Sequence, residues 1–75
     1  MLEEFRKISP QDYTKLNIIA NMMNRDSVKY ASQITDSISD FVARKVADAL
    51  VCRTISPRIE VQNLVTELKS RNLMY

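Results

Sequence analysis

The 75-residue chain is 45% hydrophobic and 27% charged, a globular composition that leaves room for one domain over residues 1–75. Eleven Lys and Arg residues against nine Asp and Glu residues leave a net charge of +2, which excludes the strongly basic surface of a dedicated nucleic-acid-binding protein. The chain has no His, one Cys and no Gly, so it lacks the usual zinc ligand sets, an internal disulfide and the glycine-rich loops that hold nucleotides.

The tripeptide Ile-Ser-Pro occurs twice, at 8–10 and at 55–57, and each copy has the form of a helix start. In the first copy, Ser9 is a favourable N-cap and Pro10 suits the first helical position, where its missing N–H needs no partner. Ile8 and Tyr13 have the spacing of a hydrophobic staple. Apolar residues at intervals of three and four then predict a helix over 10–23, namely Tyr13, Leu16, Ile19, Ala20 and Met23. A short helical turn is expected before it, from Leu2, Phe5 and Ile8.

The segment 24–26 interrupts the apolar pattern, which then resumes and predicts a second helix over 27–52. The apolar positions of this helix are Val28, Ala31, Ile34, Ile38, Phe41, Val42, Val46, Ala49 and Leu50. At 1.5 Å per residue the helix would be roughly 39 Å long, which is long for so small a domain. The sequence therefore allows a kink, with Ser37-Ile38-Ser39 as its place.

The second Ile-Ser-Pro predicts a third helix over 57–71, with Ser56 as its cap and Pro57 at its first position. Its apolar positions do not superpose on those of the first helix, which argues against an internal repeat. The connections between the predicted helices are only 3–5 residues long, which favours antiparallel neighbours. The predicted fold is therefore an all-α, three-helix bundle with a long central helix. Because Ser-Pro is also the minimal target of proline-directed kinases, modification of Ser9 or Ser56 stays open.

The residues capable of chemistry do not combine into a catalytic, cofactor or metal site. Asp36 and Asp40 lie one helical turn apart, but they face away from the apolar stripe, and Asp40 can pair with Arg44 four residues on. Cys52 has no His to activate it and is expected to be a small buried side chain. We therefore expect a protein that is not an enzyme.

The third helix carries the predicted docking surface for a partner. Four apolar residues follow the i, i+3, i+4, i+7 pattern, namely Val61, Leu64, Val65 and Leu68. They would contact a partner helix or a short peptide, while Lys69 and Arg71 would orient it or pair with its acidic or phosphorylated groups. Self-association through the long helix, as a homodimer, and weak nucleic-acid binding stay open as alternatives. Without a signal peptide or an apolar run of ~18 residues, a soluble intracellular protein that does not enter membranes is expected.

The stretch ISPQDYTKLNIIANMMNRDSVKYASQITDSISDFV resembles the opening of CTD-interacting domains, helical modules that bind the phosphorylated tail of RNA polymerase II. That family has a helix of the form Ala-x-x-Ile-x-x-x-Ile, matched here by Ala31, Ile34 and Ile38. The resemblance covers most of this chain but only the first half of such a domain, and Thr66 and Glu67 stand where the family has Asp and Ser. It implies a nuclear peptide-binding module in transcription or RNA processing.

Overall fold

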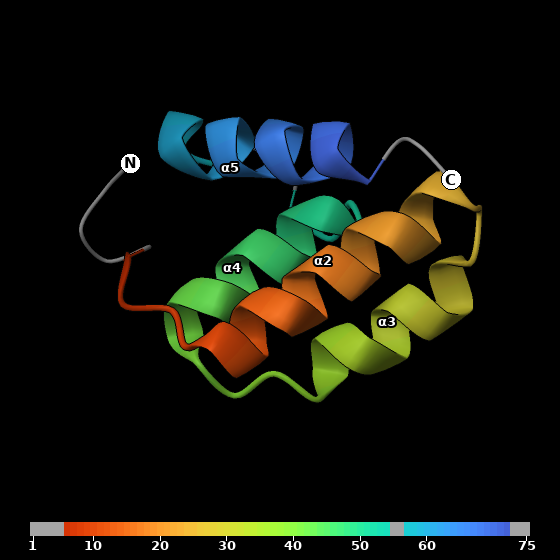
Figure 1. The fold of residues 1–75 in the computed structure, drawn as a ribbon, viewed down its shortest axis with the longest axis horizontal. Helices are drawn as coiled ribbons and strands as arrows, with labels where there is room; N and C mark the ends of the chain where they lie inside the picture. The colour runs from red at the N-terminus through yellow and green to blue at the C-terminus, as the bar shows by residue number, and fades with distance from the viewer. Residues whose placement is uncertain (1–5, 55–56, 73–75) are drawn as a thin grey trace.

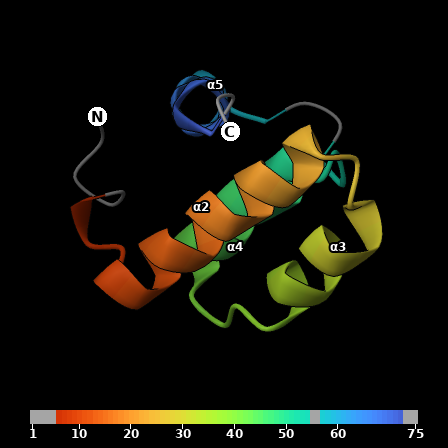
Figure 2. The same ribbon diagram turned by 45° about the vertical axis from the view of Figure 1, so that its right-hand side comes forward.

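The computed structural model describes residues 6–54 and 57–72, and within these ranges the chain forms helices and no strand. The helices are α2 (Pro10–Asn24), α3 (Val28–Asp36), α4 (Phe41–Leu50) and α5 (Ile59–Arg71). Helices α2, α3 and α4 run side by side, and α5 lies across α2 and α4 (Figure 1). Figure 2 shows α5 nearly end-on while α2 and α4 run across the view. The predicted all-α class is confirmed, but the described residues form four helices rather than three.

The predicted helix over 27–52 is divided between α3 and α4. The backbone leaves the helix after Asp36, where the hydroxyl of Ser37 donates to the carbonyl of Ile34 at 2.6 Å. Asp40 then starts α4 with extended backbone, and its carboxylate accepts from the N–H of Ala43 at 2.9 Å. One helix from 28 to 50 would measure roughly 35 Å, more than the 30 Å long axis of the molecule. The break lets α4 fold back beside α2.

The break also changes which side of α4 faces the core. The buried residues of α4 follow one helical stripe, namely Ala43, Val46, Ala47 and Leu50. Phe41, predicted to be on the apolar stripe, is the first residue of α4 and is 71% exposed. Val28, at the start of α3, is also exposed. Both expectations were wrong because they assumed one unbroken helix with one continuous face.

The first Ile-Ser-Pro starts a helix as predicted. Ser9 is the N-cap of α2, its hydroxyl accepts from the N–H of Asp12 at 3.2 Å, and Pro10 is the first helical residue. Ile8 is buried, and Tyr13 packs against the core cluster to which Ile8 belongs. Of the expected turn around Leu2, Phe5 and Ile8, only Ile8 lies within the described residues.

The second Ile-Ser-Pro lies ahead of its helix rather than inside it. Helix α5 begins at Ile59, two residues later than predicted, and Ser56 lies outside the described residues. The carbonyl of Pro57 accepts from the side-chain amide of Gln62 at 3.0 Å. The backbone N–H of Gln62 donates to the carbonyl of Arg58 at 3.0 Å, which opens the helical hydrogen bonds one residue after Pro57.

Helix α4 ends in a left-handed residue although the chain has no glycine. Cys52 has φ 62°, and its N–H donates to the carbonyl of Ala49 at 3.2 Å. The N–H of Arg53 donates to the carbonyl of Asp48 at 2.8 Å. This is the Schellman arrangement, in which glycine is the usual left-handed residue. Asp26 takes the same position after α2, with φ 59°. Cys52 is exposed here, so the expectation of a buried thiol was wrong.

Helix α5 closes the core by covering α2 and α4. The fully buried Leu16, Ile19 and Ala20 of α2 belong to the same cluster as the apolar face of α5. The predicted antiparallel packing does not extend to α5, which crosses its neighbours (Figures 1 and 2). A crossing helix covers two neighbours at once, which suits a chain too short to bury each apolar stripe separately.

Candidate functional site

The predicted docking surface of α5 is part of the protein's own core. Val61, Leu64, Val65 and Leu68 are 3%, 3%, 9% and 0% exposed. Their apolar atoms already pack within the domain, so in the folded protein this face is not open to a partner. Lys69 is half-buried, and Arg71 is exposed and pairs with Glu67 one turn earlier on α5. Among the predicted contact residues, Val61 also lines a pocket.

That pocket lies between α4 and the start of α5. Its volume is about 200 Å³, and it is lined by Lys45, Thr54, Pro57, Arg58 and Val61. The fold creates it because the chain leaves α4 through the turn at Cys52 and returns to begin α5 at Ile59. Small-molecule sites usually measure roughly 300–1,000 Å³. The pocket is therefore sized for a single large side chain.

The lining of the pocket combines apolar surface with positive charge. Most of its exposed lining is apolar, with Pro57 and Val61 contributing carbon and the cations Lys45 and Arg58 on its walls. Among the lining residues that the structure describes, Thr54 supplies a hydroxyl, and none of them carries a carboxylate, thiol or imidazole. These groups can bind an apolar side chain and a neighbouring anion. They offer no acid–base pair for a reaction.

Two exposed apolar residues flank the pocket along the helices that form it. Phe41 precedes Lys45 by one turn of α4, and the ammonium of Lys45 lies 4.3 Å from the centre of the Phe41 ring. Ile59, 67% exposed, follows the pocket residue Arg58. Sequence reasoning missed this site because Phe41 was placed in the core. The available signal was Asp40, a good N-cap directly before Phe41, together with Lys45 four residues after Phe41.

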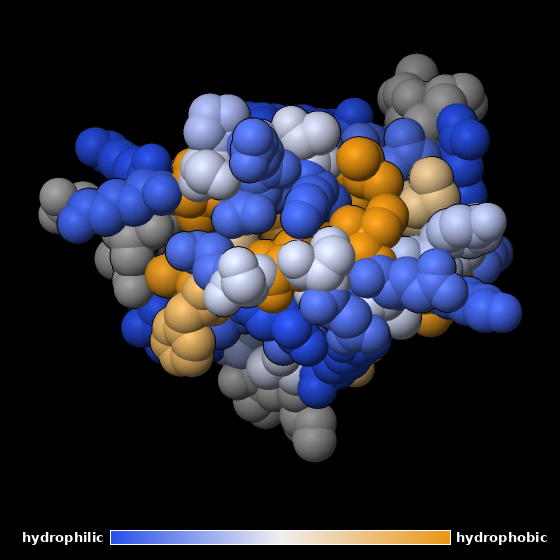
Figure 3. Space-filling view, turned by 90° about the horizontal axis from the view of Figure 1, so that it is seen from below, coloured by the Kyte–Doolittle hydropathy of each residue, from blue (hydrophilic) through white to orange (hydrophobic). Residues whose placement is uncertain are grey.

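Exposed apolar residues alone do not mark a site in this protein. Figure 3 shows apolar residues reaching a mainly hydrophilic face at several places. The exposed large apolar side chains of the described residues come from all four helices, namely Ile18, Val28, Tyr30, Phe41 and Ile59. Scattered surface residues of this kind are normal. What distinguishes Phe41 and Ile59 is that each lies next to a residue that lines the pocket.

A cluster of ion pairs holds the chain segment that forms one wall of the pocket. Asp36 accepts from Arg53 at 2.7 Å and from Arg44 at 3.4 Å, and Asp48 lies 3.3 Å from Arg44 and 3.8 Å from Arg53. The hydrogen bond from Arg53, with the positive charges of Arg53 and Arg44, lowers the pKa of Asp36 against a smaller opposing effect of desolvation. Arg53 precedes Thr54, so the cluster fixes the chain where it enters the pocket.

The same cluster corrects the predicted partner of Arg44. Its guanidinium pairs with Asp36 and Asp48, whereas the carboxylate of Asp40 is used to cap α4. Asp36 and Asp40 therefore have separate structural roles. Within the described part of the chain, no group of three or more Cys, Asp or Glu residues is arranged to hold a metal ion.

Comparison with known proteins gives no relative for this chain. No family model matches it, and neither a curated protein nor a solved structure resembles it closely enough to count as a match. Among the described residues, no helix combines the length and apolar character needed to cross a bilayer. The resemblance to CTD-interacting domains therefore stays a prediction from the sequence.

Proposed function

We propose that this domain is a non-enzymatic interaction module that binds a short acidic segment of a partner protein between α4 and α5. One observation carries the proposal: the pocket lined by Pro57 and Val61 is mainly apolar, and its walls include Lys45 and Arg58. An apolar side chain of the partner would enter this pocket, and a carboxylate or phosphate beside it would meet Lys45. Side-chain pockets with a charged rim are a recurring basis of peptide recognition.

The charge of the lining residues favours an acidic occupant. Of the lining residues within 6–54 and 57–72, Lys45 and Arg58 are cationic and none is anionic. Elsewhere on α4 the cation Arg44 is already paired with Asp36 and Asp48, whereas Lys45 contacts the ring of Phe41. A cation–π contact at an exposed site is weak, about 0.5–1 kcal/mol, so an incoming anion can compete for the ammonium.

The alternatives have less support in the fold. Self-association was expected from a long central helix, and that helix is divided into α3 and α4. Nucleic-acid binding requires clustered cations on one surface, yet Arg44, Arg53 and Arg71 form ion pairs with carboxylates. Both alternatives remain outcomes of the experiment below.

A nuclear role in transcription or RNA processing enters this proposal only through the sequence resemblance. A phosphorylated peptide from the RNA polymerase II tail is an acidic segment, so it is one natural probe of the pocket. The proposal does not depend on this ligand, because any acidic segment with a suitable apolar side chain satisfies the same chemistry.

The test uses a fluorescein-labelled peptide with one leucine between glutamates. Two matched peptides serve as controls: one has lysines in place of the glutamates, and the other has serine in place of the leucine. We expect the acidic leucine peptide to bind when titrated to about 1 mM, where a contact worth about 4 kcal/mol is half saturated. Amide NMR signals of Lys45, Thr54 and Arg58 should shift. The lysine and serine peptides should bind at least tenfold more weakly.

The matched variants are Lys45→Glu at the pocket and Lys29→Glu on the exposed surface of α3. Lys45→Glu should weaken the acidic peptide about tenfold, while Lys29→Glu should change its Kd less than twofold. Equal weakening by both variants would show attraction to net charge alone and overturn the proposed site. Signal shifts confined to other surfaces, binding of nucleic acid in its place, or a concentration-dependent dimer using the pocket would overturn it as well.

A further inference from the structure

The ring of Phe41 extends the pocket along α4 toward the start of that helix. Lys45 belongs to both features, because it lines the pocket and its ammonium lies 4.3 Å from the centre of the Phe41 ring. Residues four apart lie on the same face of a helix and about 6 Å apart along its axis. An apolar surface therefore continues for one helical turn beyond the Lys45 wall of the pocket.

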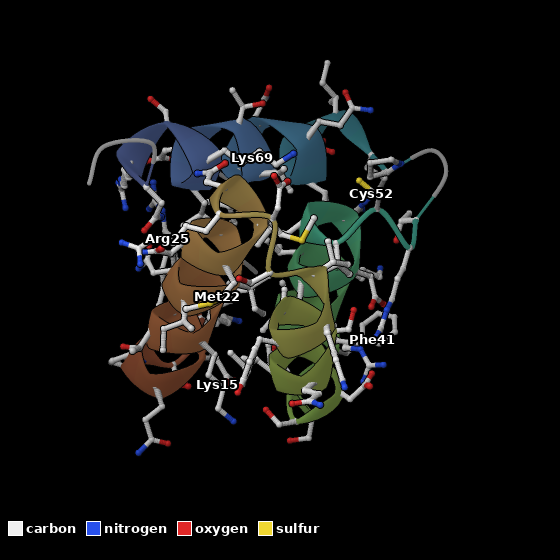
Figure 4. The ribbon with its side chains drawn as sticks, turned by 90° about the vertical axis from the view of Figure 1, so that its right-hand side faces the viewer. Lys15, Met22, Arg25, Phe41, Cys52 and Lys69 are labelled. Atoms are coloured by element: carbon white, nitrogen blue, oxygen red, sulfur yellow. The ribbon has the colours of Figure 1, made fainter. Side chains whose placement is uncertain are left out.

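The exposure of Phe41 makes this surface available. At 71%, its ring is the most exposed of the large apolar side chains that the described residues present. Figure 4 shows Phe41 and Cys52 on one edge of the molecule and Arg25 on the opposite edge. The side chains of the core are complete without Phe41, since α4 packs through Ala43, Val46 and Leu50. Packing therefore gives no reason for a phenylalanine at this position.

We propose that Phe41 is a specificity-determining residue that selects a partner helix with two apolar side chains one turn apart and an acidic side chain between them. This inference rests on the proposed function and names the partner more narrowly. One apolar side chain would enter the pocket beside Val61, and the second would lie on the Phe41 ring. The acidic side chain would face Lys45, which lies between the two contacts.

A helical partner fits this arrangement because its residues i and i+4 lie about 6 Å apart on one face, and the pocket begins at Lys45, one helical turn from Phe41. Amphipathic helices commonly bind in grooves between two helices through such i and i+4 anchors. The ridge formed by i and i+4 residues also packs between the side chains of a neighbouring helix. The competing explanation is that Phe41 and Lys45 only stabilise α4 as an intrahelical pair, in which case Phe41 has no effect on binding.

The experiment measures the Kd of two acidic helical peptides for wild type and for Phe41→Ala. One peptide has leucines at i and i+4, and in the other the second leucine is replaced by serine. We expect the two-leucine peptide to bind wild type at least fivefold more tightly than the one-leucine peptide. Phe41→Ala should abolish this difference while leaving the Kd of the one-leucine peptide within twofold. Phe41→Leu, which keeps an apolar side chain, should restore most of the preference.

Tyr30→Ala is the matched control, because Tyr30 on α3 is 65% exposed and lies away from the pocket residues in sequence. It should leave the Kd values of both peptides unchanged. Helical circular dichroism checks that each variant is folded, which the exposure of both side chains favours. If Phe41→Ala and Tyr30→Ala bind both peptides like wild type, the role of Phe41 is overturned, whereas the proposed function of the pocket is retained. If wild type binds neither peptide, the role of Phe41 and the proposed function both fail.

Discussion

The side chain of Asn24 on α2 donates hydrogen bonds to the carbonyls of Lys69 and Asn72, at 3.3 and 3.1 Å, where α5 ends. The amide of Asn72 in turn donates to the carbonyl of Leu68 at 2.7 Å and to the side-chain oxygen of Asn17 at 3.3 Å. The last carbonyls of a helix have no partner within the helix. Here α2 supplies one, which ties the end of α5 to the helix that it crosses.

Replacing Asn24 by alanine should therefore destabilise the domain. The variant removes the side-chain amide that donates to the carbonyls of Lys69 and Asn72, although the Lys69 carbonyl still accepts from the N–H of Asn72 at 3.2 Å. We expect a loss of about 1–2 kcal/mol in the free energy of unfolding. Urea denaturation followed by circular dichroism measures it. Asn63→Ala, on the exposed face of α5, is the control and should change the free energy by less than about 0.5 kcal/mol. Equal effects of the two variants would contradict the role of Asn24.

Glycine at position 52 should stabilise the protein. Cys52 has φ 62°, a left-handed conformation that costs a residue with a Cβ roughly 1–2 kcal/mol and glycine little. We expect Cys52→Gly to raise the free energy of unfolding by about 1 kcal/mol, after the greater entropy of glycine in the unfolded chain is included. Cys52→Ala keeps the Cβ and should give no such gain. A gain for alanine as large as that for glycine would show that the thiol, not the backbone angle, is responsible.

Replacing Leu68 by alanine should lower the stability of the fold, because Leu68 is a core residue and not a partner contact. Leu68 is fully buried, so Leu68→Ala removes packed atoms and leaves a cavity, at a cost of about 2–5 kcal/mol. A domain of this size has a total stability of about 4–11 kcal/mol. We expect a large fall in the urea midpoint and partial loss of helical circular dichroism at 25 °C. A variant with wild-type stability would return Leu68 to the list of partner contacts.

The stability of the domain should depend on the ionisation of Asp36. Its pKa is lowered in the folded state by the hydrogen bond from Arg53 and by the charges of Arg53 and Arg44. The resulting stabilisation is fully present above the unfolded pKa and is lost as the pH falls through the lower folded pKa. Wild type should be more stable than Asp36→Asn at pH 7, and this difference should shrink as the pH falls below about 4.

The measurement for Asp36 is a series of urea denaturations of wild type and Asp36→Asn between neutral and strongly acid pH. Added salt should reduce the difference at neutral pH, because the ion pairs are exposed to solvent. Asp12→Asn serves as a comparison, because Asp12 lies in the first turn of α2 and belongs to neither ion pair of Asp36. A difference between wild type and Asp36→Asn that is constant with pH would contradict the ion-pair explanation.

Local sequence chemistry was sufficient for the helical class and for the start of α2. Apolar residues at intervals of three and four define the helical faces, and Ser9-Pro10 makes its capping contacts within a few residues. The division between α3 and α4 was harder to predict because the apolar pattern continues through 37–40. The capping groups of Ser37 and Asp40 were present in the sequence, but their advantage over a continuous helix depends on folding α4 back against α2.

The amino-acid sequence alone determined that this chain forms amphipathic helices, because helical periodicity and N-capping are local properties of neighbouring residues. Only the tertiary structure decided how the apolar surfaces are used. It placed Leu64 and Leu68 of α5 inside the core and left Phe41 exposed beside Lys45. The physical reason is that periodicity states which side of a helix is apolar, whereas burial depends on the position and crossing of the other helices.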